Sequence, residues 1–229
     1  VPTYQEWLAF EEFLIDNGYN YDGSTTGNKF AKSISSVSGW SPSLSVGYPG
    51  NDQTSNNSTG FNALPKGFRY PNSNFINEYN DAIFWSSTEN GFSNSWYSNL
   101  KFNNEYLELA LYESKQHGFS VRFIQALQNS DNCSADGTFQ DQEGNSYDYI
   151  NYDIQAWSVD NAAMETYRDG TPIPKVTNPG EWISLTTGAW CYYLNDSSKG
   201  KLYNWYAVAG IHDNNPNTPN KEFSPEGWH

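Results

Sequence analysis

The clearest helical pattern in this sequence lies near its N-terminal end. Thr3 and Glu6 have the spacing of a capping box, Pro2 precedes the cap, and Gly18 stands where a helix would end. The apolar positions between them follow a helical period and form one broad stripe made of Tyr4, Trp7, Leu8, Phe10, Leu14 and Ile15. We therefore predict a helix ending at Gly18, and a second helix within residues 26–35.

The middle of the chain changes to a period of two, which is typical of strands with one buried face. Asn103 and Asn104 mark a hairpin turn, and Glu143 with Gly144 marks the turn of a later meander over residues 138–159. The first group of predicted strands is IFWSSTEN (83–90), SWYSNLKF (95–102), YLELALY (106–112) and FSVRFIQAL (119–127). These strands predict antiparallel sheets.

Three further segments complete the pattern. Residues 39–74 are punctuated by Gly, Pro and Asn and are predicted to be a long loop region, whereas residues 126–137 lose all periodicity and are predicted to be a linker. Asn178 and Pro179 have the order of a helix cap and first turn, before a strand WCYYL (190–194) and a short helix within 202–210. The chain as a whole is predicted to be a loop-rich α+β fold.

The composition indicates the size of the core and the environment of the protein. Nine Trp, 17 Tyr and 13 Phe supply a large core, while a mean hydropathy of -0.76 indicates many turn-forming polar residues. A formal charge of -14 opposes binding to nucleic acid, which depends on Lys and Arg, and it suits an extracellular surface that offers carboxylates to Ca²⁺. A merely solvated acidic surface is the simpler reading.

The sequence contains no apolar run long enough for a membrane span, no signal peptide and no initiator Met, so we expect a segment of a longer protein. Its two cysteines, Cys133 and Cys191, cannot form a zinc site alone. Either they form a disulfide in an oxidising compartment or both are free.

Several motifs resemble the Fibrobacter succinogenes major paralogous domain family (FISUMP). Motifs similar to the first half of that family lie late in this chain: YRDGTPIPKVT (167–177), TGAWCYY (187–193), GKLYNWYAVAG (200–210) and SPEGWH (224–229). Motifs similar to its second half lie early: VPTYQEW (1–7), GNKFAK (27–32), TGFNALPKGFR (59–69), WSSTE (85–89) and SVRF (120–123).

This order is the reverse of the family's. We read residues 1–125 as the C-terminal half of a FISUMP-like domain, 126–137 as a linker and 138–229 as the N-terminal half. Three explanations remain open: one period of a tandem array, halves of two different neighbours, or a circularly permuted domain. The array is favoured because SPEGWH would run directly into VPTYQEW. The residues at that junction are Trp228, His229, Val1, Pro2 and Trp7.

The resemblance implies a bacterial secreted or surface-anchored protein of no defined activity, with a fold similar to C-type lectins: small antiparallel sheets, two or three short helices and long ordered loops. Relatives often have Cys where this chain has Phe123, which leaves Cys191 without its family partner, so that Cys133 is the remaining candidate.

Candidate chemistry is sparse. His117, His212 and His229 lack metal-ligand spacing, and no nucleophile with a base or phosphate loop is present, so we expect no enzyme and no required cofactor. Structural Ca²⁺ remains an option for the Asx-rich runs 51–57, 78–82 and 212–217, for which turn formation is the simpler reading.

Rings in or near the loops are candidates for stacking on sugars, although such rings more often pin loops to a core. These ligand candidates are Trp40, Tyr48, Tyr70 and Trp96. Glycosylation sequons occur at Asn56, Asn57, Asn132 and Asn195.

Two functions follow as hypotheses. The first is a structural subunit of an extracellular bacterial fibre or surface array, in which copies associate head to tail and an isolated segment exposes Trp-rich edges. The alternative is a C-type-lectin-like adhesin that binds carbohydrate or protein through its long loops. An adhesin should lose glycan binding when Trp40 or Trp96 is replaced.

Overall fold

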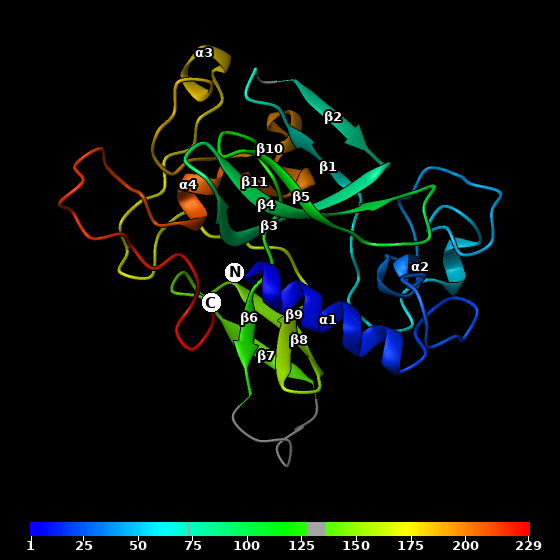
Figure 1. Ribbon diagram of the computed structural model, residues 1–229. Helices are drawn as coiled ribbons and strands as arrows, with labels where there is room; N and C mark the ends of the chain where they lie inside the picture. Colours follow the sequence, from blue (N-terminus) through cyan, green and yellow to red (C-terminus); the bar gives the residue numbers. More distant parts are fainter. Residues whose placement is uncertain (73, 128–135) are drawn as a thin grey trace.

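A computed structural model describes residues 1–72, 74–127 and 136–229 of the chain (Figure 1). Its first element is the helix α1 (Tyr4–Asp16). The predicted capping box is confirmed, because the Thr3 hydroxyl accepts from the amide of Glu6 (3.2 Å) and the Glu6 carboxylate accepts from the amide of Thr3 (2.7 Å). Gly18 follows the C-cap with a φ of +73°, a left-handed conformation that glycine adopts without strain.

The first sheet is antiparallel with the order β3 (Asp81–Asn90), β4 (Asn94–Lys101) and β5 (Glu108–Ser114). These strands confirm three of the predicted period-two segments, and the connection between β4 and β5 contains the predicted turn at Asn103 and Asn104. Register shifts interrupt both pairings, and β5 forms one edge of the sheet.

The second sheet combines strands from the middle of the chain in the order β6 (Ile124–Ala126), β9 (Gln155–Ser158), β8 (Ser146–Tyr152) and β7 (Gly137–Gln140). The strands β7, β8 and β9 are the predicted meander, with Gly144 at a φ of +82° in its first turn. β6 belongs to the early part of the chain and pairs antiparallel with β9 from the late part.

The predicted strand over 119–127 is wrong for most of its length, because only Ile124–Ala126 forms a ladder. Residues 119–123 are instead buried and divide their backbone hydrogen bonds among several segments. Phe119 and Tyr203 exchange two bonds, Ser120 accepts from Trp85, and Val121 accepts from Ala162. Because these bonds go to several different segments, residues 119–123 do not form a ladder with one neighbouring strand.

The remaining elements are short. The predicted second helix is reduced to α2 (Ala31–Ile34), and the predicted long loop contains a 3₁₀ turn η1 (Gln53–Ser55) and the strand β1 (Lys66–Arg69), which pairs with β2 (Phe75–Glu78). The late part of the chain contributes α3 (Pro179–Trp182), β10 (Trp190–Tyr192), η3 (Tyr193–Asn195), η4 (Ser197–Lys199), β11 (Lys201–Tyr203) and α4 (Trp205–Val208). Asn178 caps α3 as predicted.

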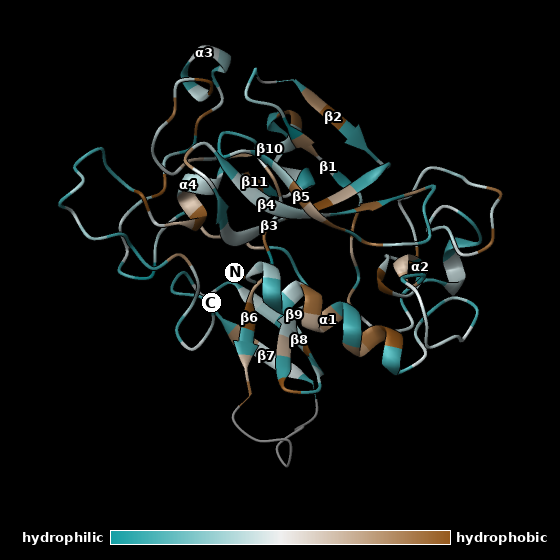
Figure 2. Ribbon diagram, viewed as in Figure 1, coloured by the Kyte–Doolittle hydropathy of each residue, from teal (hydrophilic) through white to brown (hydrophobic). Residues whose placement is uncertain are grey.

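The helix α1 lies between the two larger sheets (Figure 1). On one side its rings meet Phe84 of β3, and on the other Trp7 and Phe10 each lie 4.7 Å from the ring of Trp157 of β9. Figure 2 shows hydrophobic segments on α1 and β6 and mostly hydrophilic residues along the outer loops. The fold is therefore α+β, with small antiparallel sheets arranged around a buried helix and an aromatic core.

The early and late parts of the chain close on each other. The largest apolar cluster draws residues from both, including Trp85 and Phe119 from the early part and Tyr203 and Trp205 from the late part. The expectation that an isolated segment leaves Trp-rich edges exposed is therefore wrong for this structure, because these rings cover one another.

Candidate functional site

The most specific arrangement of side chains lies along the surface where residues 1–125 contact residues 138–229, which we call the joint. Arg69 follows a buried position of β1 and is itself buried. Its Nη1 donates to the carbonyl of Val176 (2.8 Å) and its Nη2 to that of Thr177 (3.3 Å). The guanidinium also lies 4.1 Å from the ring centre of Trp182. One early side chain therefore holds a late loop by hydrogen bonds and a cation–π contact.

Arg122 makes a second connection of the same type. Its Nη1 donates to the carbonyls of Ser158 (2.7 Å) and Val159, and its Nη2 donates to that of Asn62 (3.1 Å). Burial lowers the pKa of this guanidinium to about 10, which still leaves it charged at neutral pH. The fixed fork of an arginine suits this task, because one side chain supplies donors to three separate carbonyls.

Indole N–H groups add three bonds across the joint. Trp85 donates to the carbonyl of Tyr203 (2.9 Å) and Trp205 donates to that of Ser86 (2.9 Å). Trp182 donates to the carbonyl of Gln116 (2.7 Å). The joint is therefore both apolar and hydrogen-bonded, which fixes one relative position of the two parts.

The residues predicted at the junction meet within one chain, and the termini lie side by side (Figure 1). His229 exchanges two backbone bonds with Ile124 (2.8 and 2.9 Å), and its ring lies 2.7 Å from the Glu6 carboxylate. The amino group of Val1 donates to Ser224 (3.1 Å), and burial lowers its pKa to about 5. The others also pack inward: the Trp228 ring stacks on Phe139 at 3.8 Å, Pro2 accepts from Ser87, and Trp7 lies in the core.

The four predicted ligand-binding rings do not form one site. Trp40 is only 4% exposed and lies in the core that surrounds α1, whereas Tyr48 is partly buried in a different turn. Tyr70 is more exposed and packs beside His117, with ring centres 5.2 Å apart. Trp96 lies on β4 rather than in a loop.

Trp96 is the centre of a small aromatic stack that the sequence analysis missed. Its ring lies 5.2 Å from Tyr4 in a stacked arrangement and 5.7 Å from Tyr112 edge to face. Tyr112 is 55% exposed. A cross-strand pairing of positions 96 and 112 was the signal that could have identified this stack.

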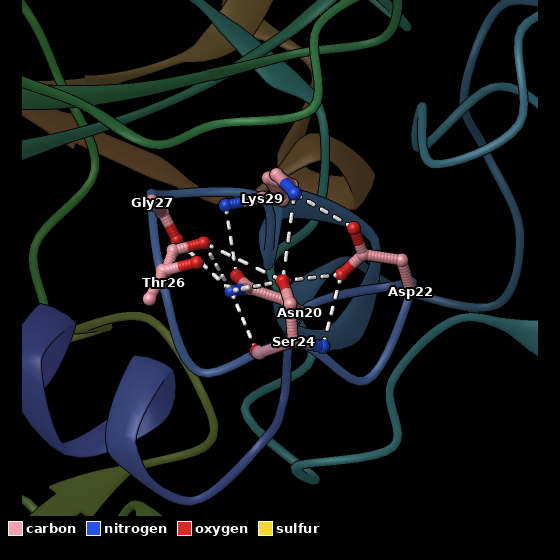
Figure 3. A network of polar contacts seen from close by, with 6 residues as sticks. All are labelled: Asn20, Asp22, Ser24, Thr26, Gly27 and Lys29. Carbon is pink, nitrogen blue, oxygen red and sulfur yellow. Dashed lines mark hydrogen bonds and ion pairs between the residues drawn. The ribbon is translucent and has the colours of Figure 1, made fainter.

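Several oxygens in the Asx-rich loops accept hydrogen bonds from donors of the chain itself. In the loop of residues 20–29, the side-chain amide of Asn20 donates to the carbonyls of Ser24 (2.8 Å) and Gly27 (2.9 Å), and Lys29 pairs with Asp22 (2.7 Å) (Figure 3). In the predicted run 51–57, the ammonium of Lys32 contacts the carbonyls of Asn51 and Asp52 and the side-chain oxygen of Asn56.

The two other predicted runs behave similarly. Asp81 accepts from the side chain of Asn77 (2.6 Å), and Asp213 accepts from the amide of Asn215 (2.9 Å). Within residues 1–72, 74–127 and 136–229, no three or more His, Cys, Asp or Glu side chains gather where they could hold a metal ion. Turn formation accounts for some of the polar contacts in these loops, and the ammonium groups of Lys29 and Lys32 account for others.

The predicted modification sites differ in accessibility. Asn56 is 6% exposed, and its amide donates to the carbonyls of Ser36 and Pro49, so a glycan there would require both bonds to break. Asn57 is partly buried, whereas Asn195 is exposed in a turn. Asn132 and Cys133 lie outside the described residues. Cys191 is buried beside Trp182 and Leu202, and burial raises the pKa of its thiol.

The sequence alone did not identify Arg69 and Arg122, the two arginines of the joint, as important positions. A signal for Arg122 was present, because it interrupts the apolar run FSVRFI without an acidic neighbour in the sequence. A charged residue there requires partners from elsewhere in the fold.

Among the described residues, no helix combines the length and apolar character needed to cross a membrane.

Comparison with known proteins identifies a family match. The sequence model of the Fibrobacter succinogenes major domain matches residues 1–125 and 150–229. No curated protein matches the chain, and no solved structure does. Both stretches of the family match contribute to the joint, through Arg69 and Arg122 from the first and Tyr203 and Trp205 from the second. The chain therefore belongs to the Fibrobacter succinogenes major domain family.

Proposed function

We propose that this chain is a non-enzymatic structural subunit of an extracellular bacterial fibre or surface array built from tandem domains of this family. The joint is the observation that carries the proposal. Several residues of the family motifs, including Arg69, Arg122, Trp85 and Trp205, hold two parts of the chain together. Side chains committed to buried structural bonds are unavailable for chemistry on a substrate.

The joint also suggests how stiffness would arise in such an array. Each bond across it links an early residue to a late residue, so the same bonds can form within one chain or between the late part of one copy and the early part of the next. In the second case the array would be continuous, because every copy would share a core with its neighbour. In the first case it would be a row of closed domains.

Electron microscopy of the native material tests the proposal. We expect a filament or lattice whose axial repeat corresponds to one domain per 229 residues. Discrete particles without periodic order would contradict the structural role. Calcium would be at most a structural ion in this proposal. Chelation of calcium should then lower the melting temperature without separating the two parts of the chain at the joint.

The aromatic stack around Trp96 favours a second candidate, a C-type-lectin-like adhesin that binds carbohydrate. Tyr4, Trp96 and Tyr112 present partly exposed rings held by mutual stacking, and rings fixed in this way can stack on sugars at little cost in conformational entropy. This surface lies on the sheet β3–β4–β5 and the start of α1 rather than in the loops where the sequence analysis placed it.

A glycan array tests the adhesin. Binding that is lost in Tyr112→Ala and Trp96→Ala would support it. Phe92→Ala is a matched control, because Phe92 is an aromatic residue that is 98% exposed and has no ring contact with this stack. Binding lost equally in the control, or no binding to the array at all, would leave the structural role as the sole candidate.

A further inference from the structure

The turn between β5 and residue 119 contains a histidine that the proposed structural role does not by itself explain. His117 is 4% exposed, and its ring packs against Phe68, Tyr70 and Phe119. Its Nδ1 lies 3.1 Å from the carbonyl of Ser114, so this nitrogen carries the proton and donates. The other nitrogen, Nε2, is buried and has no hydrogen-bond partner among the described residues.

The polar groups around this ring are few. The Glu113 carboxylate lies 3.9 Å from Nε2, too far for a hydrogen bond, and its side chain is 47% exposed. The ring of Tyr70 packs against His117 and that of Tyr97 against Phe119, and burial raises the pKa of Tyr97 to about 12. Two cations in the neighbourhood are directed elsewhere: Arg69 contacts Val176 and Thr177, and Lys115 contacts Glu89 and Phe92.

The histidine stands within a continuous run of joint contacts. The carbonyl of Lys115 accepts from Trp205, and that of Gln116 accepts from the indole of Trp182. On its other side, Gly118 packs so closely that an added Cβ would lie 3.2 Å from Trp182, and Phe119 exchanges two bonds with Tyr203. Movement of the His117 ring would therefore disturb bonds between the early and late parts of the chain.

We propose that His117 is a proton-sensitive element of the joint, which weakens the association of the two parts as the pH falls below neutrality. A proton on Nε2 would place a charge among three aromatic rings, and the half-exposed Glu113 offers incomplete compensation at its present distance. Burial accordingly lowers the pKa of His117 below its ordinary value of 6.5.

The sign of the effect follows from proton binding. Because the folded state binds the proton less readily than the unfolded state, the unfolded state gains protons first as the pH falls through about 6.5. Stability contributed by neutral His117 is therefore present above that pH and is lost below it, until the folded state is protonated as well. One proton changes the unfolding constant by close to tenfold per pH unit at most.

The test is urea unfolding of the full chain between pH 7.5 and 5 for the wild type and His117→Gln, with Ile34→Val as a matched control. Ile34 is fully buried around α1 and does not titrate, so its variant should lose stability equally at every pH. We expect the unfolding constant of the wild type to rise more steeply with acidification than that of His117→Gln. Equal slopes in these two proteins would overturn the proposal.

A second measurement keeps the proposal testable if His117→Gln does not fold. Titration of the wild-type ring by NMR should give a midpoint for His117 below 6.5, with line broadening of joint residues such as Trp182 and Trp205 over the same range. A midpoint at or above 6.5 would mean that the folded joint accepts the proton readily, which contradicts the proposed role.

Discussion

At the scale of single residues, the two buried arginines show how this chain uses charged side chains to bind backbone carbonyls. Arg122 donates to carbonyls of Ser158, Val159 and Asn62, and its guanidinium lies 4.7 Å from the ring centre of Phe61. Burial of a guanidinium is costly, so removing it relieves a penalty. That relief competes with the cost of leaving three carbonyls without a donor.

The carbonyls decide the outcome in our first prediction. We expect Arg122→Met to lower the free energy of unfolding by about 3 kcal/mol, since each buried carbonyl left unpaired costs about 1–3 kcal/mol. Arg122→Lys keeps the charge but loses the fork, so it should fall between the wild type and Arg122→Met. Urea unfolding midpoints measure the order. A loss below about 1 kcal/mol for Arg122→Met would show that the joint does not depend on these bonds.

At the scale of elements, α1 depends on its first turn because its apolar stripe must face two sheets at once. The capping box fixes where the helix begins. The Glu6 carboxylate also lies 2.7 Å from Nε2 of His229. Burial alone would raise the pKa of Glu6, but the hydrogen bonds from His229 and Thr3 hold this pKa below its ordinary value. The cap therefore ties the start of the helix to the end of the chain.

Our second prediction concerns this cap. Thr3→Ala removes the hydroxyl that accepts from Glu6 and should lower the free energy of unfolding by about 1 kcal/mol. Thr3→Ser keeps the hydroxyl and should remain close to the wild type. Thermal unfolding followed by circular dichroism distinguishes the two. Equal melting temperatures for Thr3→Ala and Thr3→Ser would mean that packing alone positions α1.

At the scale of the whole molecule, the early and late parts of the chain are not independent units. The four-stranded sheet takes β6 from one part and β7, β8 and β9 from the other, and the largest apolar cluster is also shared. Neither part has a complete core without its partner. In the proposed array, this mutual dependence would be met either within each chain, as closed domains, or between neighbouring copies.

The third prediction is that residues 1–127 and 136–229, produced as separate chains, fold only together. Each alone should lack the near-ultraviolet circular dichroism of packed aromatic rings, whereas a mixture should recover it and elute as a one-to-one complex. The variant Arg122→Met in the first fragment should weaken the complex. A first fragment that unfolds cooperatively by itself would show that the joint is an interface between two stable domains.

The sequence predicted local features well where short-range rules decide them. The helix after Thr3, the turn at Gly144 and the cap at Asn178 were all correct, because a capping side chain or a left-handed glycine acts on its immediate neighbours. The segment 119–123 has the same alternating pattern as β4 but forms no ladder. The alternating pattern of residues 119–123 reflects burial of the segment. Only the packing of distant segments determines which backbone hydrogen bonds these residues make.

The sequence by itself therefore determined the type of fold, most of the strands and the family motifs, since periodicity, turn chemistry and composition are encoded locally. The tertiary structure decided what those motifs do. Side chains of the joint donate hydrogen bonds to carbonyls that lie between about 36 and 119 positions away in the chain, as seen for Arg69, Arg122, Trp85 and Trp205. A buried donor must find its acceptor wherever the fold brings one within reach, and that acceptor cannot be identified from neighbouring residues.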